Sequence, residues 1–301
     1  MTADVLVTGA TGYIGGLLAS QLSSEGISIR VAGRRTASLE DRFPGCEVAA
    51  LDALDPSTLP EALAGIKVAY YLIHSMERGA TDFAERDKTA ARNFGEAALS
   101  AGVRRVVYLG GLGDDSDTLS HHLSSRHETG RALAEHGPPL IELRAGIVIG
   151  AGSASFRMLR DLVHRLPAMV TPKWVDTRAQ PIAVDDVVTY LSAARTVAAD
   201  ENHLVVEIGG RDVLSYRELM KRFAIAGGRR PPLIVPVPVL TPRLSSLWCG
   251  LVTAVPVSIA RPLIDGLKNE VVVRDDVASR LFPDVHPMGF DEATKRALAG
   301  R

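Results

Sequence analysis

The sequence contains little cysteine and no excess of charge of either sign. Its two cysteines, Cys46 and Cys249, are too far apart to suggest a disulfide framework or a zinc-ligand spacing. We therefore expect a reducing, cytoplasmic compartment and no metal site. Lys and Arg total 34 against 35 Asp and Glu, a formal net charge of −1. Because nucleic-acid-binding proteins usually carry a basic excess, we expect no nucleic-acid partner.

Long hydrophobic segments are also missing. The chain begins Met1-Thr2-Ala3-Asp4, without the basic and apolar segments of a signal peptide. The longest stretch without a charged residue, 244–260, has 17 residues and contains Pro256 and several Ser, Thr and Gly residues. This stretch is too short and too polar to predict a membrane span.

Short apolar runs alternate with amphipathic segments over the first half of the 301 residues. The runs are continuous, as expected of strands buried on both faces, and the segments between them have helical spacing. Repeated strand–helix–strand units predict an α/β fold with a doubly wound parallel sheet of the Rossmann type. The predicted strands are 5–8, 28–32, 47–51, 68–73, 105–109 and 140–144, and the predicted helices are 13–25, 56–64, 81–101 and 124–135.

The second half of the chain has a different pattern. We predict a Rossmann core over 1–150 and a smaller, mostly helical substrate or lid region over 151–301, interleaved with the last sheet strands. Expected elements are a strand at 181–186, helices at 187–199 and 215–226, and a strand at 204–208. Residues 231–264 carry two charges and seven prolines. We interpret them as an apolar lid, with a substrate channel or a peripheral membrane contact as less favoured alternatives.

A glycine-rich loop follows the first predicted strand and opens a helix. Gly9 permits a tight turn, Gly12 lets the backbone approach a pyrophosphate, and Gly15 lets the helix pack closely. Backbone N–H groups and the helix dipole favour phosphate at this position. The predicted loop contacts with a dinucleotide are Gly9, Ala10, Thr11, Gly12, Tyr13, Ile14 and Gly15.

Two arginines follow the second predicted strand, where NAD-binding enzymes usually place an acidic residue. Arg34 and Arg35 offer guanidinium groups that can pair bidentately with a 2′-phosphate and stack on adenine. We predict NADP(H) as the cofactor, with Arg34 as the principal ligand of the 2′-phosphate. The alternative is that both are solvated charges at the end of a strand.

Taken together, the motifs resemble those of atypical short-chain dehydrogenase/reductases of the NmrA-like, NAD(P)H-binding type. They are the T-G-x-x-G-x-x-G loop, Y-Y-L-I-H-S-M at 70–76, S-S-R-H-E at 124–128 and Q-P-I-A-V-D-D-V at 180–187. The resemblance implies that Asp52 and Ala53 contact the adenine, although Asp52 or Asp55 could equally cap the next helix. It also places Ile73, His74 and Ser75 beside the ribose and nicotinamide, with a purely structural role for His74 as the alternative.

The Tyr-x-x-x-Lys pair of short-chain reductases is absent, because no Lys follows any of the six tyrosines at that spacing. Leu143-Arg144-Ala145 resembles the Leu-Arg-Pro of the family, and counting back from it puts Arg126 at the position of the Lys and His122 at that of the Tyr. The two side chains share one helix face. We predict that His122 donates a proton and that Arg126 anchors ribose or substrate. A solvated helix start would show the same residues.

These observations predict an NADPH-dependent reductase of an apolar or aromatic carbonyl, enone or quinone. The expected partner is therefore an apolar small-molecule substrate. The alternative is a non-catalytic NADP(H)-binding redox sensor or an assembly or regulatory protein, which the missing Tyr-x-x-x-Lys pair favours.

Overall fold

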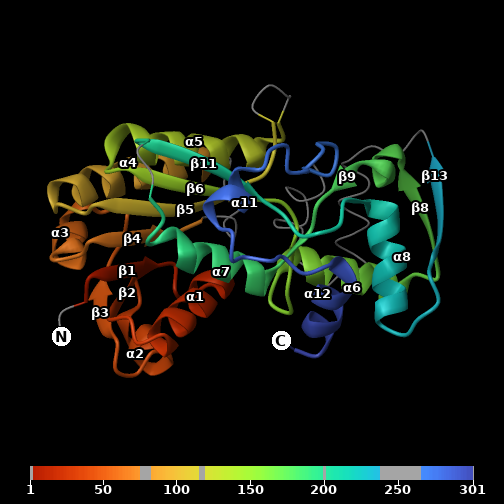
Figure 1. The fold of residues 1–301 in the computed structure, drawn as a ribbon, viewed down its shortest axis with the longest axis horizontal. Coiled ribbons are helices and arrows are strands. Elements are labelled where there is room, and N and C mark those ends of the chain that lie inside the picture. The colour runs from red at the N-terminus through yellow and green to blue at the C-terminus, as the bar shows by residue number, and fades with distance from the viewer. Residues whose placement is uncertain (1–2, 75–82, 115–118, 199–200, 238–265, 301) are drawn as a thin grey trace.

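The computed structural model describes residues 3–74, 83–114, 119–198, 201–237 and 266–300, and it is built around a seven-stranded parallel sheet (Figure 1). The strand order is β11-β6-β5-β4-β1-β2-β3. The predicted α/β fold class is thus confirmed. The strands are β1 (Val5–Thr8), β2 (Ile29–Gly33), β3 (Glu47–Ala50), β4 (Val68–Tyr71), β5 (Arg105–Gly111), β6 (Leu140–Ala145) and β11 (His203–Ile208).

Helices cover both faces of this sheet, each over its own hydrophobic cluster (Figure 1). One face carries α1 (Tyr13–Ser24), α2 (Thr36–Arg42), α7 (Val184–Ala194) and α11 (Val277–Leu281). The other carries α3 (Leu59–Leu63), which follows the short helix η1 (Pro56–Thr58), together with α4 (Phe83–Ser100) and α5 (His121–His136). This arrangement explains why the strands are continuous apolar runs in the sequence, because both of their faces are buried.

A second region of the molecule, with a third hydrophobic cluster, lies beyond the end of β6. It is built on three two-stranded pairs, β7·β10, β9·β12 and β8·β13, and on the helices α6, α8 and α12. The bounds are β7 (Val148–Ile149), α6 (Ala154–Arg165), β8 (Ala168–Pro172), η2 (Lys173–Asp176), β9 (Arg178–Ala179), β10 (Ile182–Ala183), β12 (Leu214–Ser215), α8 (Tyr216–Ala226), β13 (Leu233–Val237) and α12 (Phe290–Leu298).

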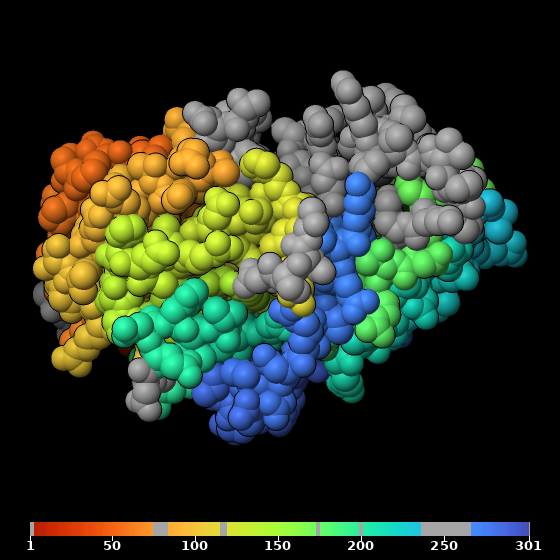
Figure 2. Space-filling model, turned by 90° about the horizontal axis from the view of Figure 1, so that it is seen from above, coloured from red at the N-terminus to blue at the C-terminus, as the bar shows by residue number. Residues whose placement is uncertain are grey.

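The C-terminal segment 266–300 lies against both parts of the molecule. Figure 2 shows it in blue between the yellow-green helices of the sheet and the green second region. The Arg274 backbone N–H donates to Glu207 at the end of β11 (2.9 Å), and the Gln180 backbone N–H donates to the Val271 carbonyl oxygen (2.8 Å). The end of the chain therefore joins the second region to the sheet.

Several predicted boundaries need correction. The capping box of α8 is present as predicted, with Ser215 and Glu218 bonded reciprocally. In contrast, α7 begins at Val184 and ends at Ala194, earlier at both ends than the predicted 187–199. Helix α5 begins at His121 rather than Ser124, because the Ser120 hydroxyl accepts the Leu123 N–H at 3.4 Å. No helix among the described residues is long and apolar enough to cross a membrane.

Candidate dinucleotide and catalytic site

The glycine-rich loop lies where the strand order changes direction, between β1 and its neighbour β4. Ligands of doubly wound sheets bind at such a point. Gly9 has φ +67°, and a Cβ on it would lie 2.3 Å from the Leu72 carbonyl oxygen. A Cβ on Gly15 would lie 2.4 Å from the Gly9 carbonyl oxygen. Both positions therefore require glycine, as the sequence predicts.

The N-terminus of α1 has the features of a phosphate site. Its N-cap, Gly12, is exposed and provides no side-chain cap, and the first turn contains no acidic residue. The first backbone N–H groups of a helix have no partner within the helix, so those of Tyr13, Ile14 and Gly15 are available to phosphate oxygens. The Tyr13 ring packs against Gly150 and Gly152, where added Cβ atoms would lie 2.5 and 2.4 Å from it.

Three arginines lie after β2 and at the end of α2. Arg34 and Arg35 are exposed directly after β2, and Arg35 is the N-cap of α2. Arg42, at the end of α2, donates from Nη1 to the Thr11 carbonyl oxygen at 3.0 Å. Its other terminal nitrogen lies against Gly16, since a Cβ there would be 2.1 Å away. Our sequence reasoning missed Arg42, because its contact depends on α2 folding back onto α1.

The two acidic residues after β3, Asp52 and Asp55, make different contacts. Asp55 caps the short helix at 56–58 by accepting the Ser57 N–H (3.1 Å). Asp52 is half-buried and accepts the Leu54 N–H through Oδ1 at 3.1 Å. Ala53 is buried, and its carbonyl oxygen accepts from Asn93 of α4 at 3.0 Å. The helix cap is therefore Asp55, and the adenine contact of Asp52 and Ala53 stays a prediction.

Two histidines and an aspartate form a cluster at the carboxyl ends of β4 and β5. His74, three residues past the end of β4, contacts Asp87 of α4 through Nδ1 (3.2 Å from Oδ2). The His122 ring, on α5, lies with its centroid 5.4 Å from that of His74. Among the described residues, Nε2 of His74 and Nδ1 of His122 are buried and have no hydrogen-bond partner. Buried polar atoms normally have partners, so these two nitrogens mark a place where a ligand can bind.

Burial in this cluster favours the neutral form of both imidazoles. Burial lowers the pKa of His122 to about 3, and the nearby Arg126 charge adds to the effect. Burial also lowers the pKa of His74, although the hydrogen bond to Asp87 opposes this shift. An ionised carboxylate accepts hydrogen bonds, so Asp87 selects the tautomer of His74 with the hydrogen on Nδ1. The free Nε2 is then an acceptor.

Arg126 lies one helical turn beyond His122 and faces the end of β5. Its guanidinium donates to the Leu109 carbonyl oxygen and lies 5.3 Å from the centre of the Tyr108 ring. The Tyr108 hydroxyl in turn donates to the Arg126 carbonyl oxygen at 3.1 Å. In this structure Arg126 thus joins α5 to β5, and contact with ribose or substrate stays a prediction.

Comparison with known proteins agrees with this geometry. Residues 9–138 match the model of a family described as NAD(P)H-binding. This part of the chain is similar to NAD(P)H-binding domains. The match and the fold agree with the resemblance to atypical, NmrA-like short-chain dehydrogenase/reductases.

The similarity to known proteins extends beyond residues 9–138. A ceramide reductase of Caulobacter vibrioides is 28% identical over 237 residues, which cover 76% of this chain and 72% of that protein. The NADP(H) complex of Citrobacter sp. triphenylmethane reductase has a TM-score of 0.76 at 20% identity, covering 98% and 99% of the two chains. An Escherichia coli NADPH-dependent quinone oxidoreductase complexed with NADPH gives the same values. At these identities the solved structures establish the fold.

Part of the predicted site lies outside the described residues. This part is Ser75 and most of the segment 231–264, which we interpret from the sequence as a lid. Ile73 is half-buried next to His74, and its contact with the ribose and nicotinamide stays a prediction. Asp87 was missed by our sequence reasoning. A signal for it was present, because it lies on the helix that follows His74 and is a carboxylate within an otherwise apolar helix face.

Proposed function

We propose that this protein is an NADPH-dependent reductase of an apolar or aromatic carbonyl, enone or quinone. The observation that carries the proposal is a pair of buried imidazole nitrogens, on His74 and His122, that have no hydrogen-bond partner in the described part of the chain and lie at the sheet edge that also holds the phosphate loop. The names of similar proteins, which are reductases of ceramide, triphenylmethane dyes and quinones, support a substrate with large apolar parts.

The choice of NADPH rests on three cations at the adenosine side of the loop. Arg34 and Arg35 are exposed at the end of β2, and Arg42 lies against the loop itself. A 2′-phosphate there would form charge-assisted pairs with guanidinium groups, each stronger than a neutral hydrogen bond. We expect Arg34→Ala to weaken NADPH binding by about tenfold or more and to leave NADH binding nearly unchanged. Calorimetric titration with both dinucleotides measures the difference, and an unchanged preference would contradict the assignment.

In this proposal His122 acts as a neutral hydrogen-bond donor. NADPH, when bound, supplies a hydride, and reduction of a carbonyl then places negative charge on its oxygen. With a pKa of about 3, His122 is not an imidazolium at neutral pH, so its N–H would stabilise that charge by hydrogen bonding, and the proton that completes the alcohol would come from water. This role differs from the proton donation that the alignment with the missing Tyr suggests.

His74 is assigned a role in orientation. Asp87 fixes its ring by holding Nδ1–H, which leaves Nε2 as an acceptor for a ribose hydroxyl or an amide N–H group of the bound dinucleotide. Asp87 itself is a positioning residue, because it acts through His74.

The second candidate is a non-catalytic NADP(H)-binding protein. It is favoured by Arg126, whose guanidinium is bonded to the Leu109 carbonyl oxygen at the position where the family has a catalytic Lys. Such a protein would bind NADPH with the same loop and arginines and would not oxidise it.

A turnover assay separates the two candidates. NADPH oxidation is followed after addition of a panel of quinones, enones and aromatic ketones. The reductase proposal predicts turnover that falls by about 100-fold in His122→Phe, as expected for loss of one hydrogen bond to a developing oxyanion. The neighbouring exposed His121→Phe is the matched control and should stay within about twofold of the wild type. NADPH binding without oxidation by any compound would favour the sensor or assembly role.

A further inference from the structure

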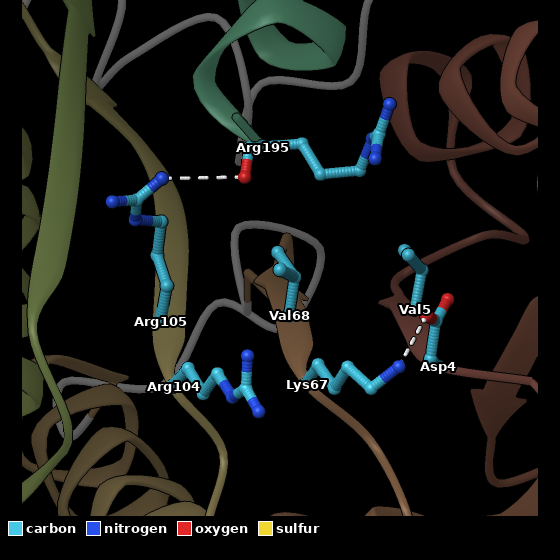
Figure 3. Close-up of a pocket in the computed structure, with 7 residues that line it drawn as sticks. All are labelled: Asp4, Val5, Lys67, Val68, Arg104, Arg105 and Arg195. Atoms are coloured by element: carbon cyan, nitrogen blue, oxygen red, sulfur yellow. Dashed lines mark hydrogen bonds and ion pairs between the residues drawn. The ribbon is translucent and has the colours of Figure 1, made fainter. Parts of the chain in front are cut away.

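A second polar site lies at the amino ends of the sheet strands, opposite the carboxyl ends that hold the phosphate loop. A cavity of about 290 Å³ opens at the amino ends of β1, β4 and β5 and at the end of α7 (Figure 3). Its lining residues are Asp4, Val5, Lys67, Val68, Arg104, Arg105 and Arg195. Because all strands of the sheet are parallel, their amino ends lie a full strand length from the carboxyl edge that holds the loop.

Positive charge is concentrated in this cavity. Four of the seven lining residues are cationic, and the carboxylate among them, Asp4, is paired with Lys67 (Nζ–Oδ2, 3.0 Å). Arg104 is exposed at the start of β5, and neither it nor Arg195 has an ion pair with a carboxylate among the described residues. Like charges that line one cavity repel one another, and an anion bound between them relieves this repulsion.

Arg105 and Arg195 are partly withdrawn from water, and the described residues give neither of them a carboxylate partner. Arg105 donates from Nη1 to the carbonyl oxygens of Ala194 (3.4 Å) and Arg195 (3.2 Å), which end α7. Nε of Arg105 and Nε of Arg195 are both buried and have no hydrogen-bond partner in the part of the chain that the structure describes. Burial lowers the pKa of Arg105, which reflects a charge that lacks compensation. An anion in the cavity would supply the missing acceptors.

We propose that this cavity is a binding site for a phosphorylated small molecule. Guanidinium groups pair bidentately with phosphate oxygens, and the arginines approach the cavity from β5 and from the end of α7. Its volume is near the lower limit of about 300 Å³ for small-molecule sites, which suits a diphosphate or a small sugar phosphate better than a second dinucleotide. The phosphate could belong to a free solute or to an acidic phospholipid headgroup. This site is independent of the proposed reductase activity.

Inorganic pyrophosphate is the probe for the free-solute form. It is titrated calorimetrically into the full chain saturated with NADPH, so that the phosphate loop is occupied and does not contribute. The test variant is Arg104→Ala combined with Arg195→Ala, because neither side chain donates a hydrogen bond that holds the described fold together. Arg105 is kept, since it ties β5 to α7.

The control is a variant of the same charge change elsewhere. Arg230, exposed between α8 and β13, is changed to Ala together with exposed Arg131 of α5. We expect the cavity double variant to weaken pyrophosphate binding at least tenfold and the control double variant to change it less than twofold. Thermal unfolding of both variants checks that they are folded.

Vesicle flotation distinguishes the two sources of phosphate. Phosphatidylglycerol vesicles that capture the wild type but not the cavity variant would identify a lipid headgroup, with phosphatidylcholine vesicles as the neutral control. Pyrophosphate binding that the cavity substitutions leave unchanged, or no binding of either probe by the wild type, would overturn the proposal.

Discussion

Acid should destabilise this protein through His122 in particular. Its imidazole is held neutral in the fold, with a pKa of about 3 against the usual 6.5. Between these two values the unfolded chain takes up a proton that the folded chain excludes, so the free energy of unfolding falls as pH falls. For one group with these values the loss at about pH 4.5, relative to neutral pH, is about 2–3 kcal/mol.

The measurement is urea denaturation at about pH 7.5 and about pH 4.5, for the wild type and for His122→Gln. Glutamine cannot titrate, so the variant should lose about 2–3 kcal/mol less between the two pH values than the wild type. His121→Gln, on the exposed side of the same helical turn, is the control and should follow the wild type. Equal losses in the wild type and in His122→Gln would refute the reasoning that burial keeps this imidazole neutral.

Two further predictions concern the loop and the core. Gly9→Ala should destabilise the protein by several kcal/mol and abolish NADPH binding, because its Cβ would lie 2.3 Å from the Leu72 carbonyl oxygen at φ +67°. Gly26→Ala, with φ +76° but nothing within 4 Å, should cost only about 1 kcal/mol and leave binding intact, as thermal unfolding and calorimetry would show. Glu142→Gln should lower the free energy of unfolding by about 3–5 kcal/mol, because buried Arg144 would lose its carboxylate partner at 2.8 Å. A variant as stable as the wild type in urea would contradict that estimate.

The first half of the fold could be predicted well because its signals are local. Each strand is a short apolar run that must be buried on both faces, and β1 occupies 5–8 as predicted. The predicted start of α5 was wrong, because the helix is capped by Ser120, one turn before Ser124. The strand pairings β9·β12 and β8·β13 were not predicted, because two-residue and proline-containing strands carry little periodic signal.

The part of the candidate site that is formed by backbone atoms could be predicted. Gly9 and Gly15 are required for steric reasons, and their spacing in the sequence already indicates this requirement. Gly110 and Gly111, at the end of β5, are required by packing that only the structure shows. Added Cβ atoms there would lie 2.8 Å from the Glu142 carboxylate and 2.8 Å from the Leu123 side chain.

The strands of the sheet, the glycine-rich loop and the missing Tyr-x-x-x-Lys pair can be derived from the amino-acid sequence, because each depends on neighbouring residues and short spacings. Tertiary packing is needed to show that Asp87 holds His74 beside His122 and that Arg42 reaches Thr11. It alone also brought Arg195 to the cavity beside Arg105. These contacts join segments that are distant in the chain, and the burial that perturbs their charges exists only once the helices have packed on the sheet.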